Sequence, residues 1–191
     1  MVSLERIKRT DPRILSDMAV HYSEPGGFVG RNICYAITHN GLYYGAIVGG
    51  SATLHLPGRD EFFKIDKKDK VGKKAALRTI VNNIFFHIEK RGDRYPVRNM
   101  VSKTLKLYRE RVANDWQDKY GDPVTGFESL IELPRTGEAY TRDGWEEVGI
   151  TVGYTCKRIS GKGRHRTDSW TGQRVWDTKN KRPKRVFVRH L

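Results

Sequence analysis

The side chains best suited to proton transfer in this sequence are His21 and its neighbour Tyr22, which follow a short amphipathic segment. An unperturbed histidine titrates near neutral pH, so it serves as a general base more readily than other side chains. The adjacent phenol can stack on a flat substrate or relay a proton. We therefore predict His21 as a general base with Tyr22 beside it, the alternative being a surface histidine at a helix end.

Two adjacent asparagines, Asn82 and Asn83, interrupt an apolar run over residues 79–89. Amides are costly to bury without hydrogen-bond partners, and successive residues of a strand face opposite sides of a sheet. We predict that one of the two amides faces a ligand, with Asn83 in the catalytic site and Asn82 against a bound donor. The alternative is an amide that satisfies the backbone of a β-bulge.

Further polar side chains fall where a helix or strand would present them to a ligand. Ser102 lies in the first turn of a long helix predicted over about 97–120, where its hydroxyl can donate to a carbonyl oxygen or simply cap the helix. Glu128 and Glu132 are four residues apart in one predicted strand and therefore share a face. One of these carboxylates is expected to orient His21 or bind an amine, the alternative being an exposed strand.

A strand, a loop and a long helix in mid-chain, residues 79–120, form the unit around which the other predicted elements are arranged. Along the helix, apolar residues recur at spacings of three or four, at Val101, Leu105, Tyr108, Val112 and Trp116. Helices are also predicted at 12–22 and 59–65, strands at 31–39, 42–50, 127–133, 148–157 and 184–191, a short helix or turn at 137–145 and a charged loop at 66–74. This order predicts an α/β chain with a single mixed, mostly antiparallel sheet and helices on both faces.

The net charge of +14 and the isoelectric point near 9.9 favour a polyanionic partner, most often nucleic acid. Twelve positive and two negative residues lie between positions 157 and 190, so this segment carries 10 of the 14 net charges. We expect a basic insertion at about 157–183, before the last strand, to bind phosphates, with tryptophans stacking on bases. The residues predicted to bind nucleic acid are Arg31, Lys162, Arg164, Arg166, Trp170, Arg174, Lys181, Arg182, Lys184 and Arg185. The alternative is a generically basic protein.

Length and composition exclude several classes of protein. At 191 residues the chain is expected to form one domain over 1–191. No apolar run approaches the roughly 18 residues of a membrane span, and the first residues lack the apolar core of a signal peptide. We therefore predict a cytoplasmic protein with no membrane partner. Cys34 and Cys156 are expected to be reduced thiols, no spacing predicts a metal site, and the oligomeric state is left open.

The order of elements is similar to the GNAT acyltransferase fold, in which a strand–loop–helix unit in mid-chain binds the donor. Residues 144–149 (Gly-Trp-Glu-Glu-Val-Gly) look like the Gly-aromatic-x-x-x-Gly stretch that follows this unit. Other short motifs are His21-Tyr22, Val29-Gly30-Arg31, Val81-Asn82-Asn83, Asn99-x-x-Ser102, Asp115-Trp116, Tyr120-Gly121 and Gly137-x-x-Tyr140. In this order, over about 12–158 and 184–191, the set resembles the Mom-type branch of the GNAT superfamily and a related domain of bacterial anti-phage systems.

The resemblance implies a phage-type enzyme that transfers an acyl or glycyl-derived group to adenine N6 in double-stranded DNA. The product would be a carbamoylmethyl adenine, which protects the DNA from restriction. Because the N6 lone pair is delocalised into the ring, such an enzyme must flip out the base, remove a proton and polarise the acyl carbonyl. By resemblance, Asn83 and Ser102 would position the reactants, and Tyr140 would protonate the leaving group. The alternative for Tyr140 is an aromatic ring packed on the sheet.

The donor implied by the fold is acetyl-CoA, or else an aminoacyl-tRNA or other glycyl donor, which makes tRNA a further candidate partner. Asn82, Arg98 and Asn99 are predicted to bind it. One departure concerns the head of the long helix, because residues 95–102 carry none of the glycines that bind pyrophosphate in acetyl-CoA enzymes of this fold. Arg98 would then hold a single phosphate or carboxyl-like group. Two alternatives stay open: a non-catalytic nucleic-acid-binding protein and an ordinary CoA-dependent N-acetyltransferase.

Overall fold

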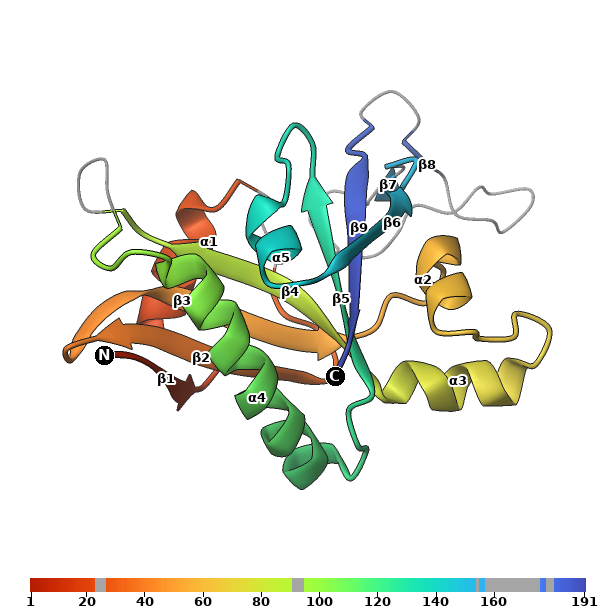
Figure 1. Ribbon diagram of the computed structural model, residues 1–191, viewed down its shortest axis with the longest axis horizontal. Helices are drawn as coiled ribbons and strands as arrows, with labels where there is room; N and C mark the ends of the chain where they lie inside the picture. The colour runs from red at the N-terminus through yellow and green to blue at the C-terminus, as the bar shows by residue number, and fades with distance from the viewer. Residues whose placement is uncertain (23–26, 91–94, 154, 157–175, 178–180) are drawn as a thin grey trace.

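A seven-stranded sheet in the order β1-β2-β3-β4-β5-β9-β6 organises the computed structural model of the chain, which describes residues 1–22, 27–90, 95–153, 155–156, 176–177 and 181–191 (Figure 1). The strands are β1 (Val2–Ile7), β2 (Asn32–His39), β3 (Leu42–Ser51), β4 (Ile80–Ile88), β5 (Gly126–Glu132), β6 (Glu146–Ile150) and β9 (Lys184–His190). Only β4 and β5 run parallel, and the other neighbours pair antiparallel. The predicted mixed, mostly antiparallel sheet is confirmed.

Five helices surround the sheet within the described residues. They are α1 (Pro12–Val20), α2 (Pro57–Phe62), α3 (Lys70–Arg78), α4 (Met100–Tyr120) and α5 (Glu138–Arg142). A separate two-residue ladder joins β7 (Thr155–Cys156) to β8 (Trp176–Asp177). The strand predicted over 148–157 is therefore divided, and its second part pairs outside the main sheet.

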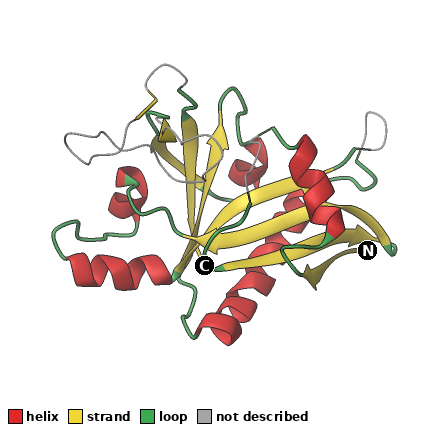
Figure 2. Ribbon diagram, turned by 180° about the vertical axis from the view of Figure 1, so that it is seen from behind, coloured by secondary structure: helices red, strands yellow, loops and turns green. Residues whose placement is uncertain are grey.

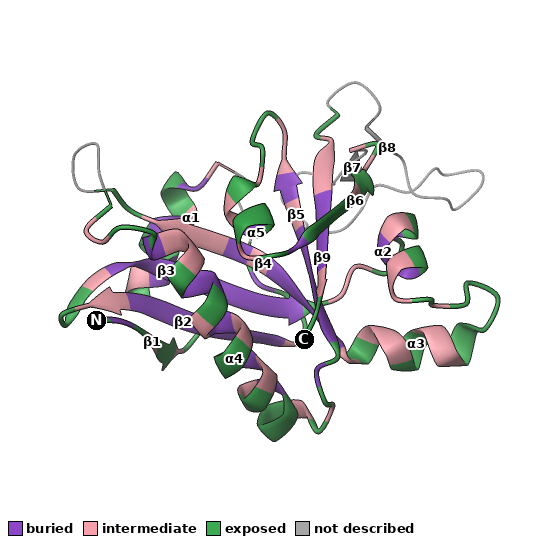
Figure 3. Ribbon diagram, in the orientation of Figure 1, coloured by how far each residue is buried: buried purple, intermediate pink, exposed green. Residues whose placement is uncertain are grey.

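The two faces of the sheet carry different helices. On one face, α4 packs its predicted apolar stripe, including Tyr108, Val112 and Trp116, into the main core. On the opposite face, visible in Figure 2, α1 inserts Ile14 against Val48. The central strands are buried between these layers, whereas the outer surfaces of α3 and α4 are exposed (Figure 3). Helices on both faces thus follow from strands that are apolar on both sides.

The prediction of a charged loop over residues 66–74 is wrong for its second half, because α3 begins at Lys70. Asp69 caps this helix by accepting hydrogen bonds from the backbone N–H groups of Val71 and Gly72. No residue of α3 is fully buried, but Lys73, Ala76 and Leu77 are half-buried at the spacing of one helix face. Lysine and alanine also favour helix intrinsically, so the prediction missed a helix whose signals are in the sequence.

We expect Gly49→Ala to lower the free energy of unfolding by about 1–3 kcal/mol, because α4 approaches β3 too closely for a side chain there. A Cβ at Gly49 would lie 2.7 Å from the Tyr108 hydroxyl and 2.9 Å from Val81 Cγ1. Urea denaturation measures the difference. Ser51→Ala, a change at an exposed position of the same strand, is the control. Equal stability of the two variants would contradict the close approach.

Candidate active site

A cavity opens where β4 and β5 separate. The two strands pair only from Ile80 with Gly126 to Asn83 with Ser129 and then diverge, as Figure 1 shows. At the same point the register with β3 shifts, since Val48 faces Phe85 whereas the next residue, Gly49, faces Asn83. Ile84 is therefore the extra residue of a β-bulge, which bends β4 away from its neighbour. The space left between the strands measures about 760 Å³.

Five of the six residues predicted as catalytic line this cavity: His21, Tyr22, Asn83, Glu132 and Tyr140. They come from four separate parts of the chain. The first two follow the C-terminal end of α1 on one face of the sheet, Asn83 lies at the divergence point, Glu132 ends β5, and Tyr140 lies in α5. Ser102 is in the first turn of α4, as predicted, and is not among the lining residues.

His21 is held in a neutral form by its surroundings. Its side chain is 6% exposed, and its ring lies 4.2 Å from the Tyr22 ring centroid and 4.6 Å from that of Phe85. Burial lowers the pKa of His21 from 6.5 to about 4, against the opposing effect of the hydrogen bond with the Phe86 carbonyl and with a smaller lowering contribution from Arg135. At neutral pH the imidazole is therefore unprotonated and able to accept a proton.

The tautomer of His21 follows from its backbone contact. Nε2 lies 3.3 Å from the carbonyl oxygen of Phe86, and a carbonyl oxygen can only accept a hydrogen bond. The proton of the neutral ring is thus on Nε2, and Nδ1 carries the lone pair. A neutral imidazole in this tautomer is basic at Nδ1.

The same pKa shift predicts a stability change with pH. Between about pH 6.5 and 4 the unfolded chain protonates at His21 and the folded chain does not, so the folded state loses stability as the pH falls through this window. From pH 7 to 5 the loss at this residue should be about 2 kcal/mol. We expect His21→Gln to remove that part of the pH dependence. Urea denaturation of both proteins at pH 7 and 5 measures it, and parallel losses would contradict the shifted pKa.

Tyr140 and Asn83 form a buried hydrogen-bonded pair at the divergence point. The Tyr140 hydroxyl donates to Asn83 Oδ1 at 2.5 Å. Burial raises the pKa of Tyr140 well above its ordinary value, so the phenol keeps its proton. Asn83 Nδ2 donates to the carbonyl oxygens of Val48 and Phe85, each at 3.1 Å. Both amide hydrogens thus satisfy the bulge, which was the alternative considered for this residue, and Asn83 acts by holding Tyr140.

Asp143 fixes the position of α5 and therefore of Tyr140. Arg109 of α4 forms two hydrogen bonds with the Asp143 carboxylate, at 2.8 and 2.9 Å, and Trp145 Nε1 donates to it at 2.8 Å. The Tyr140 ring packs edge-on against Trp145. The sequence analysis did not identify Arg109 and Asp143, because 34 residues separate them and neither belongs to a motif.

Two basic residues, Arg135 and Lys184, line the cavity together with two carboxylates, Glu132 and Glu138. The Arg135 guanidinium lies 3.4 Å above the Tyr22 ring centroid, a cation–π contact. Lys184, predicted to bind nucleic acid, also lines the cavity. Arg135 was missed by the sequence analysis, although its place in the loop three residues after the end of β5 is a signal for a site residue. Glu132 lies 3.7 Å from Arg182, so its carboxylate is partly compensated by a cation.

The residues predicted to bind the donor are not gathered at this cavity. Asn82 faces the opposite side of the sheet from Asn83, as expected for neighbours in a strand, and donates to Thr53 Oγ1 at 3.1 Å. Arg98 and Asn99 are exposed at the head of α4, where Asn99 has a left-handed backbone and makes no side-chain cap. Their role in donor binding stays a prediction.

Some residues predicted to bind nucleic acid lie outside the described ranges, and others form ion pairs within the protein. Lys162, Arg164, Arg166, Trp170 and Arg174 lie outside the described residues. Arg31 forms an ion pair with Asp122 at 2.6 Å and stacks on Trp116 and Tyr120. Arg185 pairs with Glu147 at 2.8 Å. These two arginines therefore have structural partners, and nucleic-acid binding by them stays a prediction.

Two classes of feature are not found in the part of the chain that the structure describes. Its histidines, cysteines and carboxylates do not form a group of three or more that could hold a metal ion. None of its helices is both long and apolar enough to cross a membrane.

Comparison with known proteins identifies the fold through similar solved structures. No family profile and no curated protein match the sequence. A GNAT family acetyltransferase from Elizabethkingia anophelis with acetyl-CoA bound has a TM-score of 0.57 at 8% identity, over 100% of this chain and 98% of that one. A Bacillus subtilis acetyltransferase in complex with CoA has 0.55 at 9%, over 100% and 99%. Polyamine N-acetyltransferase of Drosophila melanogaster has 0.52 at 13%, over both whole chains. The chain has the fold of the GNAT acetyltransferases.

Proposed function

We propose that the protein is an acyltransferase that works in the cavity between β4 and β5 and whose acceptor is the N6 amine of adenine in DNA. The observation that carries the transfer chemistry is the arrangement of two groups around this cavity: the neutral imidazole of His21 and the protonated phenol of Tyr140. One can accept a proton and the other can donate one. The fold, shared with acetyltransferases that bind acetyl-CoA or CoA, supports the same reaction class.

The proposed reaction needs one proton acceptor and one proton donor. The acceptor amine attacks the acyl carbonyl carbon of an activated donor, a thioester or ester, and a C–N bond forms; this step gives an N6-acyl adenine, an isomer of the carbamoylmethyl product when the acyl group is glycyl. His21 Nδ1 takes the proton that the amine loses. The bond from the carbonyl carbon to the leaving sulfur or oxygen breaks, and that atom receives the proton of Tyr140. Asn83 positions the phenol by accepting its hydrogen bond in the resting site.

A CoA-type donor fits this chain in part. The cavity where the strands diverge has room for an acyl arm. The head of α4 offers the exposed cation Arg98 but no glycine from residue 95 to 102, so backbone amides there cannot surround a pyrophosphate closely. The phosphates of an aminoacyl-tRNA would likewise find only Arg98 as a cation over residues 95–102. The donor is therefore a phosphate-carrying thioester or ester, either a CoA-type donor or an aminoacyl-tRNA.

Charge supports the choice of a nucleic-acid acceptor. The chain has a net charge of +14, and phosphates of DNA would be drawn to a protein of that charge. In the cavity itself, Arg135 and Lys184 stand beside the carboxylates Glu132 and Glu138. The Tyr22 ring and its stacked guanidinium form a flat platform on which an extruded base can lie. The finer assignment to adenine N6 rests on the resemblance to the Mom-type branch.

The test is a search for the modified nucleoside. DNA from cells that express the protein is digested to nucleosides and analysed by mass spectrometry, with His21→Gln expressed at the same level as the control. We expect a mass-shifted deoxyadenosine with the unchanged protein only. Unshifted nucleosides together with salt-dependent DNA binding would instead identify a binding protein. Unshifted nucleosides with acetylation of a small amine would identify an ordinary N-acetyltransferase.

A further inference from the structure

A second cavity, of about 770 Å³, lies on the connection between β3 and β4 and shares no lining residue with the first. We infer that this cavity binds a nucleotide, with its phosphate on a lysine rim and its base on an apolar floor. The inference does not depend on the proposed acyl transfer. It rests on the composition of the cavity, on its unbalanced charge and on a buried ion network that fixes one wall.

The lining of the second cavity contains two kinds of residue. The apolar ones, which we name the floor, are Ala52, Leu54, Leu56, Pro57 and Leu77. The cationic ones, which we name the rim, are Arg31, Lys67, Lys70, Lys73, Lys74 and Arg78. Leu54 is 63% exposed, so a large apolar side chain faces solvent in a cavity that is also lined by cations. A ligand that has both a flat ring and an anionic group can contact the apolar floor with its ring and the cationic rim with its charge.

The positive charge of the rim is only partly compensated. Asp60, the one carboxylate among the lining residues, is engaged by Lys73, and Asp122 pairs with both Arg31 and Arg78. Lys67, Lys70 and Lys74 make no ion pair with any residue that the structure describes.

Two of these uncompensated lysines repel each other. Lys70 and Lys74 are one helical turn apart on α3, a spacing at which like charges are destabilising. A phosphate bound between them would relieve that repulsion. The rim therefore gains more from an anion than isolated surface lysines would.

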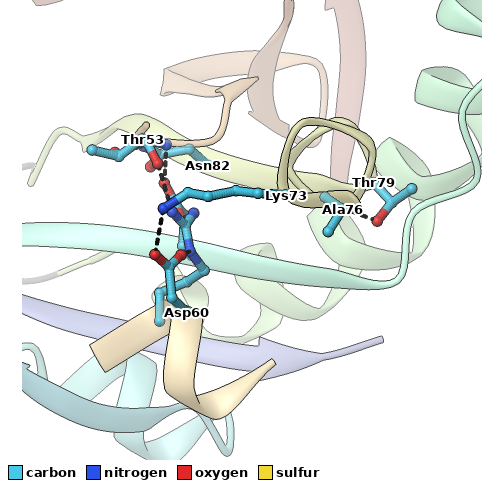
Figure 4. A network of polar contacts seen from close by, with 8 residues as sticks. Thr53, Asp60, Lys73, Ala76, Thr79 and Asn82 are labelled. Atoms are coloured by element: carbon cyan, nitrogen blue, oxygen red, sulfur yellow. Dashed lines mark hydrogen bonds and ion pairs between the residues drawn. The ribbon is translucent and has the colours of Figure 1, made fainter. Parts of the chain in front are cut away.

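A buried network holds the wall of this cavity in place. Arg59 is fully buried and bonds to Glu128, to Asp60 at 2.8 Å and to the carbonyl oxygen of Thr53 at 2.6 Å. Lys73 Nζ donates to the other oxygen of Asp60 at 2.6 Å, as Figure 4 shows. The Lys73 side chain is only 14% exposed. The cavity is thus preformed on one side, which lowers the conformational cost of binding.

Binding assays with defined probes test the inference. Adenosine monophosphate, inorganic phosphate and a labelled single-stranded deoxyadenosine decamer are titrated into the full-length protein by calorimetry or fluorescence anisotropy. The first variant is Lys70→Glu with Lys74→Glu. The matched control is Lys103→Glu with Lys106→Glu, which makes the same charge change on exposed positions of α4. A second variant, Ala52→Trp, fills the floor without changing the charge.

We expect the α3 pair of substitutions to weaken nucleotide binding about 10-fold or more and the α4 pair to change it less than about 2-fold. Ala52→Trp should weaken the binding of the nucleotide and leave the affinity for inorganic phosphate unchanged. Binding of the monophosphate without the decamer would identify a free nucleotide as the ligand, and binding of both would identify a strand. Equal losses in the two charge-reversed variants, or no binding of either nucleotide probe, would overturn the inference.

Discussion

Replacing Arg59 with methionine is expected to lower the free energy of unfolding by about 3–5 kcal/mol, since the change leaves buried carboxylates without their main cation. Glu128 and Asp60 are 0% and 2% exposed, and both bond to the Arg59 guanidinium. Burial already raises the pKa of Glu128, against the opposing effect of Arg59. Without the arginine, Glu128 would have to take up a proton or draw water into the core.

The measurement is urea denaturation at pH 7 with a double-mutant cycle. In the cycle, Arg59→Met combined with Glu128→Leu should be more stable than Arg59→Met alone, because apolar residues replace the unpaired charge. Arg142→Met is the matched control, since Arg142 pairs with Glu138 on the exposed surface of α5. That control should change stability by less than about 0.5 kcal/mol. Similar losses in Arg59→Met and Arg142→Met would show that the network is not buried as described.

The network also settles the ionisation of its second carboxylate. Burial by itself opposes the charged form of Asp60, but hydrogen bonds from Lys73 and Arg59 together outweigh it and the pKa is lowered. Asp60 therefore stays charged at neutral pH and continues to hold Lys73 at the wall of the second cavity. Loss of Arg59 would act on both the core and this wall.

Replacing His21 with glutamine is expected to lower the rate of acyl transfer by about 10²–10⁴-fold, the usual contribution of a general base. The effect should fall on the rate constant of the chemical step, because glutamine keeps a polar side chain of similar reach but cannot accept the amine proton. The measurement is single-turnover transfer to a deoxyadenosine-containing oligonucleotide. His39→Gln, a histidine at the end of β2, is the control and should leave the rate unchanged. A His21→Gln enzyme with the full rate would remove His21 from the mechanism.

The pH dependence gives this second prediction an independent check. Because the pKa of His21 is lowered to about 4, the imidazole is already unprotonated at pH 5.5 and the rate should not rise with a histidine-like step near pH 6.5. The rate profile of the unchanged enzyme should be flat across that region. A step centred near pH 6.5 that disappears in His21→Gln would show that His21 is basic enough to be protonated in the working enzyme, against the burial described here.

The elements with strong local signals were predictable. The Asn40-Gly41 turn joins β2 to β3 with positive φ at both residues. Asp11 caps α1, and the apolar stripe of α4 faces the core. Each of these signals can be read from a continuous stretch of sequence, without knowing how that stretch packs against the rest of the chain. His21, Tyr22 and Tyr140 were predicted as catalytic residues from their types and the resemblance, and they line one cavity; the divergence of β4 and β5 that forms this cavity was not predicted.

Only the tertiary structure decided the rest. The amide of Asn83 satisfies a bulge whose position depends on the register between β3 and β4, which no local pattern fixes. Arg59 and Glu128 meet across 69 residues of sequence, and neither a charged residue nor its spacing reveals that it will be buried. The sequence by itself therefore determined most of the strands and helices, with α3 and the divided strand over 148–157 as exceptions. The pairing of distant polar groups, and with it both cavities, was determined by how those segments pack.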